Sequence, residues 1–324
     1  MAQTIATFDT AHSGTIHDAQ LDYYGKRLAT ASADASIRVW DVSTEQHNIL
    51  AEIREHTAPV WQVAWAHPKF GSLLASSSYD RQVIVWKEVR QGDWQPVYRD
   101  ASHTGSVNGI AFSPWEFGLN LASASSDGCV GIVSNKGGDK WVRRQINNAH
   151  AYGVNAVCWC PATNPATLAS GPAVAQQNSS SSAAHLGPQR IVTGGCDNLV
   201  KIWKFDEQSD EWTEQYRFPS NAHSDWVRDV AWRPNIGIPS NTIASCSEDK
   251  TVIIWTQEMD GQPWKEQAKL KLPAPVWRLS WSITGSILAA ACGDNTVQLF
   301  KETTDNEWVP VTSFNEQGVA APFE

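Results

Sequence analysis

Histidine, serine or threonine, and aspartate recur together along this chain, and these are the residue types of a base, a nucleophile and an orienting acid. In five successive copies a hydroxyl residue stands four positions before the aspartate, and in four copies a tryptophan stands six positions after it. The members are His12, Thr30, Asp34 and Trp40; His56, Ser76, Asp80 and Trp86; His103, Ser123 and Asp127; His150, Thr193, Asp197 and Trp203; and His223, Ser245, Asp249 and Trp255.

The number of copies argues against catalysis. An active site is normally built once, whereas a motif that recurs with a structural repeat usually maintains that repeat. Five of only nine histidines belong to this pattern. We therefore predict that the pattern is structural, that the chain has no catalytic residue and that the protein is not an enzyme.

The other reactive side chains form no recognisable site. The six cysteines include no Cys-x-x-Cys pair, and Cys158-x-Cys160 lacks a nearby histidine or second pair, which favours core packing over zinc binding. Neither GxxxxGK[ST] nor GxGxxG occurs, so phosphate binding has no support. We predict no metal, no cofactor and no small-molecule substrate.

Short alternating runs of apolar and β-branched residues surround each copy and predict the elements that carry it. The second copy reads VWQVAW, LLASSS, QVIVWK and WQPVY, with turn residues between the runs. Each unit therefore contains four strands. A sixth, degenerate unit has Leu272, Ala290 and Phe300 at the histidine, hydroxyl and tryptophan positions and keeps only Asp294.

Composition is consistent with a repeated all-β protein. The chain has 324 residues and 17 tryptophans, of which most fall at equivalent positions of the units. Its net charge of −9 disfavours direct nucleic-acid binding. It contains no apolar run long enough to span a membrane and no signal-peptide pattern. We expect a soluble intracellular protein without membrane insertion.

The repeat resembles that of WD-repeat β-propellers, whose eponymous dipeptide is present as Trp40-Asp41. The resemblance implies an all-β, six-bladed propeller in which the histidine, hydroxyl, aspartate and tryptophan side chains form a buried hydrogen-bond network. We expect one domain over residues 1–324, with a leading strand in 1–11 and six blades in 12–324. Residues 170–188, rich in serine, are expected to form a flexible loop inside blade four.

Counting strands leaves closure of the ring undecided. Each of the six units contains four strands of its own, so the leading segment, residues 1–11, is not needed to complete any of the six blades. Either the six blades close by themselves, or a gap between blades one and six exposes apolar surface into which a partner donates β-structure.

Three segments make the resemblance specific to one group of WD-repeat propellers. They are DYYGKRLAT (22–30), WAHPKFG (65–71) and GGCDNLVKIWK (194–204). They resemble the small propeller subunits of the coat protein complex II (COPII) outer cage, which are shared with the Y-shaped nuclear pore scaffold complex. That resemblance implies an open propeller completed by a seventh blade from a partner.

The implied function is that of a scaffold that stiffens α-solenoid partners. These partners are the large outer-coat subunit of COPII, a scaffold nucleoporin of the Y complex and a vacuolar nutrient-signalling coat-like complex. The implied locations are the cytosolic side of the endoplasmic reticulum membrane and COPII vesicles, the nuclear pore and the vacuolar membrane. The alternative is a generic WD-repeat adapter that binds peptides on its top face.

By position, the resemblance assigns partner binding to strands that line the gap between blades one and six. Ordinary packing between blades is the competing interpretation for each residue. A charged substitution at Val276 or Leu279 would then abolish partner assembly. The assigned residues are Thr4, Ile5, Thr7, Phe8, Leu21, Tyr23, Val276, Trp277, Leu279 and Trp281.

Overall fold

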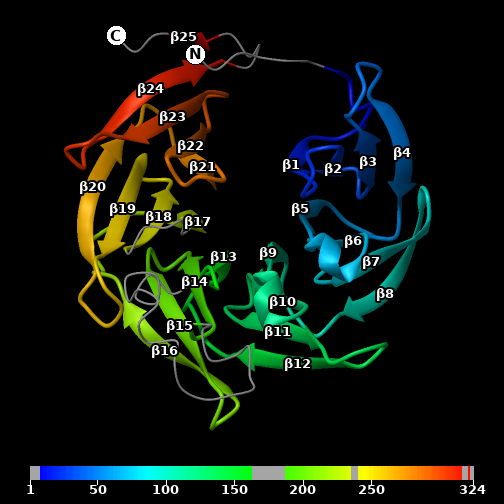
Figure 1. Ribbon diagram of the computed structural model, residues 1–324, viewed down its shortest axis with the longest axis horizontal. Coiled ribbons are helices and arrows are strands. Elements are labelled where there is room, and N and C mark those ends of the chain that lie inside the picture. The colour runs from blue at the N-terminus through cyan, green and yellow to red at the C-terminus, as the bar shows by residue number, and fades with distance from the viewer. Residues whose placement is uncertain (1–7, 163–186, 235–239, 316–319, 322–324) are drawn as a thin grey trace, which may run out of the picture. The chain divides into compact units, whose positions relative to one another are not determined.

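The computed structural model describes residues 8–162, 187–234, 240–315 and 320–321. These residues form six antiparallel β-sheets and two short 3-10 turns, η1 (Pro68–Phe70) and η2 (Trp115–Phe117), without an α-helix in the described ranges (Figure 1). Nothing in those ranges is a helix long and apolar enough to cross a membrane. The predicted all-β, six-bladed propeller is confirmed.

Each blade uses four strands consecutive in the chain, and neighbouring strands pair in chain order. The strands of blades one to three are β1 (Ile16–Leu21), β2 (Arg27–Ser32), β3 (Ile37–Asp41) and β4 (Asn48–Ile53); β5 (Val60–Trp65), β6 (Leu73–Ser78), β7 (Val83–Arg90) and β8 (Asp93–Asp100); and β9 (Val107–Phe112), β10 (Asn120–Ser125), β11 (Val130–Asn135) and β12 (Trp141–Ile146). Those of blades four to six are β13 (Val154–Trp159), β14 (Arg190–Gly195), β15 (Val200–Asp206) and β16 (Glu211–Arg217); β17 (Val227–Trp232), β18 (Asn241–Ser247), β19 (Thr251–Gln257) and β20 (Lys265–Lys271); and β21 (Val276–Trp281), β22 (Ile287–Cys292), β23 (Val297–Glu302) and β24 (Trp308–Phe314).

The second strands of blades two to five are rich in small residues because they are buried along their whole length. In blade two, β6 reads LLASSS and is buried along its whole length. Small side chains are needed there because the strand is covered on both faces and flanked by strands on both edges. The hydroxyl groups of such a strand must find hydrogen-bond partners inside the protein.

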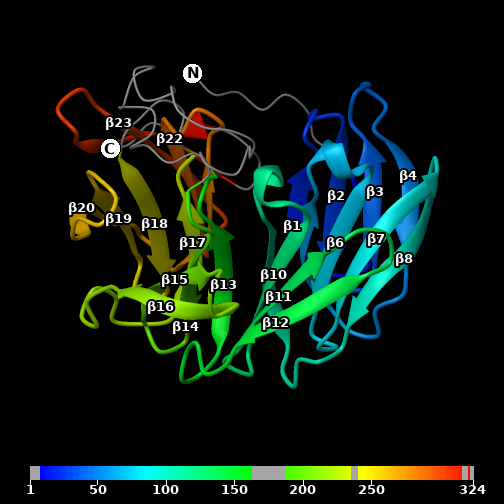
Figure 2. The same cartoon turned by 60° about the horizontal axis from the view of Figure 1, so that its bottom comes forward.

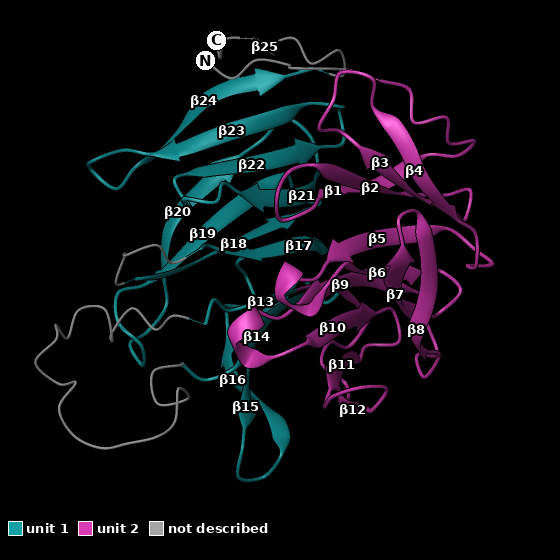
Figure 3. Ribbon diagram, turned by 45° about the vertical axis from the view of Figure 1, so that its right-hand side comes forward, with its two compact units in different colours: residues 1–4, 158–324 teal, residues 5–157 magenta. Residues whose placement is uncertain are grey.

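The described residues divide into two compact units (Figure 3). The unit of residues 5–157 contains blades one to three, whose first strands β1, β5 and β9 lie side by side. Figure 2 shows β2, β3 and β4 of blade one next to one another. The second unit, from Cys158 onward, contains blades five and six and most of blade four.

The two ends of the chain depart from simple strand counting. A short strand, β25 (Ala320–Ala321), pairs with β24 and gives blade six a fifth strand that the sequence did not predict. In the predicted leading strand, residues 8–11 belong to no strand, and residues 1–7 lie outside the described part. The serine-rich segment falls between β13 and β14, and its residues 170–186 also lie outside it.

Candidate functional site: a repeated network and the free face of blade six

Blade two shows the complete polar network. The indole Nε1 of Trp86 donates to Ser76 Oγ (2.9 Å), and Ser76 Oγ lies 2.8 Å from His56 Nε2. The imidazole Nδ1 of His56 lies 2.8 Å from a carboxylate oxygen of Asp80. Because a carboxylate only accepts, Nδ1 donates, and a neutral His56 accepts from the serine through Nε2. The four side chains form one directed chain of hydrogen bonds from β7 to the turn after β6.

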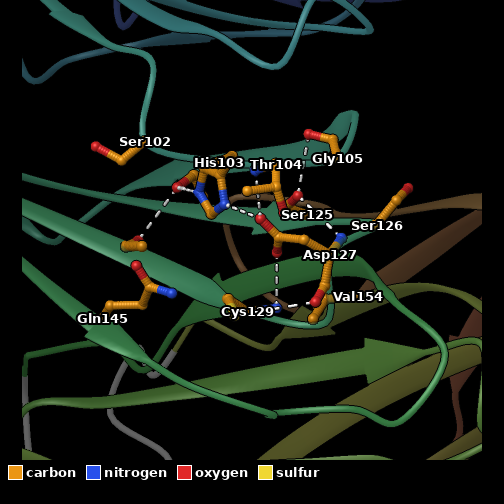
Figure 4. Close-up of polar contacts among 12 residues, drawn as sticks. Ser102, His103, Thr104, Gly105, Ser125, Ser126, Asp127, Cys129, Gln145 and Val154 are labelled. Carbon is orange, nitrogen blue, oxygen red and sulfur yellow. Dashed lines mark hydrogen bonds and ion pairs between the residues drawn. The ribbon is translucent and has the colours of Figure 1, made fainter.

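The same geometry recurs in other blades. Figure 4 shows His103 and Asp127 of blade three, where His103 Nδ1 lies 3.0 Å from the Asp127 carboxylate. The Nε2 of His103 lies 2.9 Å from Ser123 Oγ. That blade has Val133 in place of the tryptophan, so no indole donates to Ser123, whose Oγ also lies 3.3 Å from the carbonyl oxygen of Gly131. The corresponding distances in the remaining copies are His12–Asp34 3.1 Å, His12–Thr30 2.8 Å, Trp40–Thr30 3.4 Å, Trp203–Thr193 2.9 Å, His223–Asp249 3.2 Å, His223–Ser245 2.8 Å and Trp255–Ser245 3.0 Å.

Each aspartate also closes the tight turn between the second and third strands. The residue after the aspartate has a positive φ, for example 70° at Arg81 and 66° at Lys250, which is unfavourable for a residue with a side chain. The carboxylate accepts the backbone N–H two residues further on, from Gln82 and Thr251 respectively, at 3.0 and 2.9 Å. This bond holds the turn closed and offsets the backbone strain.

These hydrogen bonds determine the ionisation of the aspartates. Burial would raise the pKa of Asp80, but hydrogen bonds from His56 and from the backbone N–H groups of Thr57 and Gln82 outweigh it and lower the pKa. The pKa of Asp127 is lowered in the same way against burial, by the N–H of Cys129 and by His103. Both carboxylates therefore remain ionised to a lower pH than ordinary aspartates.

We expect Asp80→Asn to lose about 1–3 kcal/mol of stability at neutral pH, because the imidazole and two N–H groups lose a charged acceptor. The unfolded chain protonates Asp80 near pH 3.9, above the folded pKa, so the stabilisation is complete above that pH and is lost as the pH falls. The difference in urea unfolding free energy between wild type and variant should therefore shrink from pH 7 to pH 3.

The matched control for this prediction is Asp294→Asn in blade six. In the described part of that blade, Asp294 bonds to the N–H and hydroxyl of Thr296 only, and leucine replaces the histidine. A cost that is equal at both pH values, or equal for Asp294→Asn, would contradict the network account.

Neighbouring blades are joined by a second set of polar contacts, made by their first strands. Side-chain oxygens of one blade accept a backbone N–H of the next, and tryptophan indoles reach back to a carbonyl of the preceding blade. The contacts are Val63 N to Asp18 (3.1 Å), Ile110 N to Gln62 (2.8 Å), Leu279 N to Asp229 (2.8 Å), Trp65 Nε1 to Gln20 O (2.9 Å) and Trp281 Nε1 to Ala231 O (3.2 Å).

Blade six differs from blades two to five in the burial of its second strand. In β22 the residues alternate between partly exposed and buried, whereas β6, β10, β14 and β18 are buried throughout. Leu288, Ala290 and Cys292 pack into a core cluster with residues of blade five such as Cys246 and Ile254. Because strand side chains alternate between faces, the other residues of β22 point away from blade five.

We call the sheet surface of blade six that points away from blade five its free face. Register places on it the residues of β21, β23 and β24 that pair with the partly exposed positions of β22 or with one another. Most are apolar, and all are at least partly exposed. The free face comprises Arg278, Ser280, Ile287, Ala289, Ala291, Val297, Leu299, Lys301, Val309, Thr312 and Phe314.

Three of the four blade-six residues assigned to the gap point toward blade five and not onto the free face. Val276 is fully buried and Leu279 is 9% exposed in the cluster shared with blade five, and Trp281 packs against it and bonds to Ala231. Trp277 is 43% exposed, with its ring 4.6 Å from the guanidinium of Arg228 in blade five. A charge at Val276 or Leu279 would therefore damage the core, so it cannot test partner binding as expected from the sequence.

The N-terminal residues of that assignment are spread over blade one. Phe8 packs edge-on against Trp40, with ring centroids 5.3 Å apart. Leu21 ends β1 and is exposed, whereas Tyr23 lies in the following turn and points toward blade two, 4.9 Å from the ring of His67. Thr4, Ile5 and Thr7 lie outside the described residues.

Tyr23 belongs to a feature that the gap assignment missed. A cavity of about 310 Å³ opens between the turns that follow β1 and β5, lined by Tyr23, Tyr24, Lys26, Trp65 and Pro68 among others. Both tyrosines are about two-thirds exposed. A row of aromatic rings continues from them through His67 to Trp115, over which Lys69 Nζ lies 4.3 Å from the ring centroid. The signal in the sequence was the DYYGKR and AHPKFG turns.

The cysteines are consistent with core packing. Burial raises the pKa of Cys158 to about 11 and that of Cys160 to about 12, which keeps both thiols protonated and unreactive. Cys158 Sγ accepts the N–H of Trp232, joining blades four and five. Within the described stretches, no three His, Cys, Asp or Glu side chains gather closely enough to hold a metal ion.

Comparison with known proteins agrees with this architecture. Residues 2–41, 47–87, 94–133, 213–256 and 264–301 match the WD40 family, described as WD domain, G-beta repeat. The blades, the network and these matches define the chain as a WD-repeat β-propeller.

The relatives make the family more specific. The chain is 48% identical over 312 residues to the protein SEC13 homolog of Drosophila melanogaster, covering 96% of this chain and 84% of that protein. It is 48% identical to the protein transport protein SEC13 of Yarrowia lipolytica, covering 94% and 97% respectively. It is 50% identical to the protein SEC13 homolog of Dictyostelium discoideum, covering 93% and 95%. The chain belongs to the Sec13 family.

Proposed function

We propose that this protein is a non-enzymatic scaffold subunit of a vesicle coat, acting in protein transport from the endoplasmic reticulum to the Golgi. Several relatives carry the name protein transport protein SEC13, which supports a role in transport. The repeated polar side chains support a structural role, because the hydroxyl groups of Thr30, Ser76 and Ser245 are buried and no substrate can reach them.

The partner that we propose is the large outer-coat subunit of COPII, which docks β-structure on the free face of blade six. The observation that carries this proposal is the alternating burial of β22, which leaves an apolar sheet face uncovered on its unit. A β-sheet face with Ile287, Leu299 and two alanines is complementary to another sheet, and pairing two sheets buries such residues at about 25 cal/mol per Å².

The same face would serve partners of the same architecture elsewhere. We propose a scaffold nucleoporin of the Y complex and a nutrient-signalling coat-like complex as further partners. The corresponding locations are the cytosolic side of the endoplasmic reticulum and of COPII vesicles, the nuclear pore and the vacuolar membrane. Binding to each partner would exclude the others because all use one face.

The experiment that tests this proposal is reconstitution of the purified chain with the large outer-coat subunit of the same organism. We expect a stoichiometric complex by size-exclusion chromatography with light scattering. Co-elution should stop when a soluble second partner, the Y-complex nucleoporin, is supplied in excess. Separate elution of the two proteins at micromolar concentrations would contradict the proposal.

A second candidate function, a peptide-binding adapter, is favoured by the cavity between blades one and two. Its exposed tyrosines and Lys26 suit an extended peptide that carries an apolar anchor and an acidic residue. In the reconstitution, Tyr24→Ala would then abolish binding. Under the scaffold proposal, Tyr24→Ala should leave the complex intact.

A further inference from the structure

Three of the contacts between the first strands of neighbouring blades come from one register position, which in blade three is occupied by Gly109 and carries no side chain. Asp18, Gln62 and Asp229 occupy the same register, because they pair with Ala31, Ser77 and Cys246, each three residues before its turn aspartate. From this position each side chain accepts a backbone N–H of the following blade, at 3.1, 2.8 and 2.8 Å. Where this position carries a polar side chain, that side chain therefore complements a polar backbone group of the next sheet.

In blade six this register is occupied by Arg278, which pairs with Ala291 three residues before Asp294. Arg278 is partly buried on the free face. In the described part of the chain, its guanidinium makes neither a hydrogen bond nor an ion pair, unlike Arg228 and Arg233, which pair with Glu248 and Glu302. A guanidinium has only donors, so Arg278 cannot accept a backbone N–H as Asp18, Gln62 and Asp229 do.

We propose that Arg278 is a specificity-determining residue of the free face and selects a partner strand that carries a carboxylate at the facing position. This inference rests on the proposed docking of β-structure there and adds the chemistry that the docked strand must supply. In the three junctions within the chain, the side chain at this position accepts a hydrogen bond from the next blade. At blade six the direction is reversed, because Arg278 donates and the incoming sheet supplies the accepting oxygen. A carboxylate meets the planar fork of a guanidinium with two hydrogen bonds and neutralises its charge.

The surroundings of Arg278 favour a carboxylate over a neutral acceptor. The neighbouring side chains on the free face are apolar or small, including Ala289, Ala291 and Leu299. Docking would remove the guanidinium from water among such residues, and a buried charge without an opposite charge is strongly unfavourable. A partner strand with an apolar or basic residue at this position would therefore be rejected, which gives the face its selectivity.

The test uses the large outer-coat subunit as the probe and measures its dissociation constant by titration. We expect Arg278→Glu to weaken binding roughly 30-fold or more and Arg278→Gln roughly tenfold. Lys204→Glu, an exposed charge reversal on blade four, should change binding less than about twofold. All three variants should keep the melting temperature of the wild type, because no bond within the described chain depends on these side chains.

A double-mutant cycle then identifies the facing group. Acidic residues in the partner segment that becomes protected from hydrogen exchange are neutralised one at a time. One of these variants should weaken wild-type binding while leaving Arg278→Gln binding unchanged. If no carboxylate couples to Arg278, or if Arg278→Glu binds like wild type, the inference is wrong although docking itself stands. If the wild-type chain does not bind the partner, the proposed function fails and the inference fails with it.

Discussion

Replacing Ala290 by aspartate is expected to destabilise the protein by about 3–5 kcal/mol. Ala290 lies in β22 with no exposed surface and packs with Val276, Leu288 and blade-five residues such as Ile254. The side chains of that cluster are hydrophobic, and none offers a carboxylate an opposite charge. The carboxylate must remain charged without water, take up a proton, or force blade six away from blade five, and each of these outcomes is unfavourable. Urea unfolding followed by tryptophan fluorescence measures the change.

The result also separates folding from binding. Loss of partner binding by Ala290→Asp would be secondary to unfolding, as it would be for charges at Val276 or Leu279. A change below about 1 kcal/mol would show that the face toward blade five is not a packed core, contrary to its burial.

Replacing the adjacent Ala289 by aspartate is expected to have the opposite pattern. Ala289 is partly exposed on the free face, so the new carboxylate stays hydrated and stability should change by less than about 1 kcal/mol. Affinity for the large outer-coat subunit should fall about 100-fold, which corresponds to about 2.7 kcal/mol, because the added carboxylate loses water on docking and competes for Arg278 with the carboxylate proposed on the partner. Isothermal titration with the purified partner measures this change.

The two variants control for each other, since they add the same group to neighbouring residues of one strand. Ala289→Ser serves as a third, uncharged variant and should retain binding within about tenfold. Wild-type affinity in a well-folded Ala289→Asp would contradict docking on the free face.

Much of the fold could be predicted because the repeat is local and regular. The strand pattern and the spacing of His56, Ser76, Asp80 and Trp86 depend on hydrogen bonds within one blade, which every copy preserves. The resemblance to WD-repeat propellers gave these residues a network role, and the structure brings them within hydrogen-bonding distance.

The orientation of the last blade was harder to predict. Val276, Leu279 and Trp281 look like binding residues because they are large and apolar, but they are large and apolar because they pack against blade five. The free face combines small residues with Arg278, and neither feature stands out in a sequence. Only the alternation of burial in β22 distinguishes the two faces.

Two further features depend on contacts that short sequence patterns do not report. The strand β25 consists of two alanines and pairs with β24 from beyond the end of blade six. The cavity between blades one and two needs the turns after β1 and β5 to meet in space. Sequence reasoning identified DYYGKR and AHPKFG as unusual but could not place them together.

Hydrogen–deuterium exchange of the chain, alone and bound to the large outer-coat subunit, tests the central claim most directly. Docking on the free face predicts slower exchange in peptides that cover β21 to β23 of blade six, residues 276–302. Peptides that cover the turns of residues 22–27 and 66–73 should exchange at the same rate in both states. Protection confined to those turns, with blade six unchanged, would contradict the scaffold account and support the peptide-binding adapter.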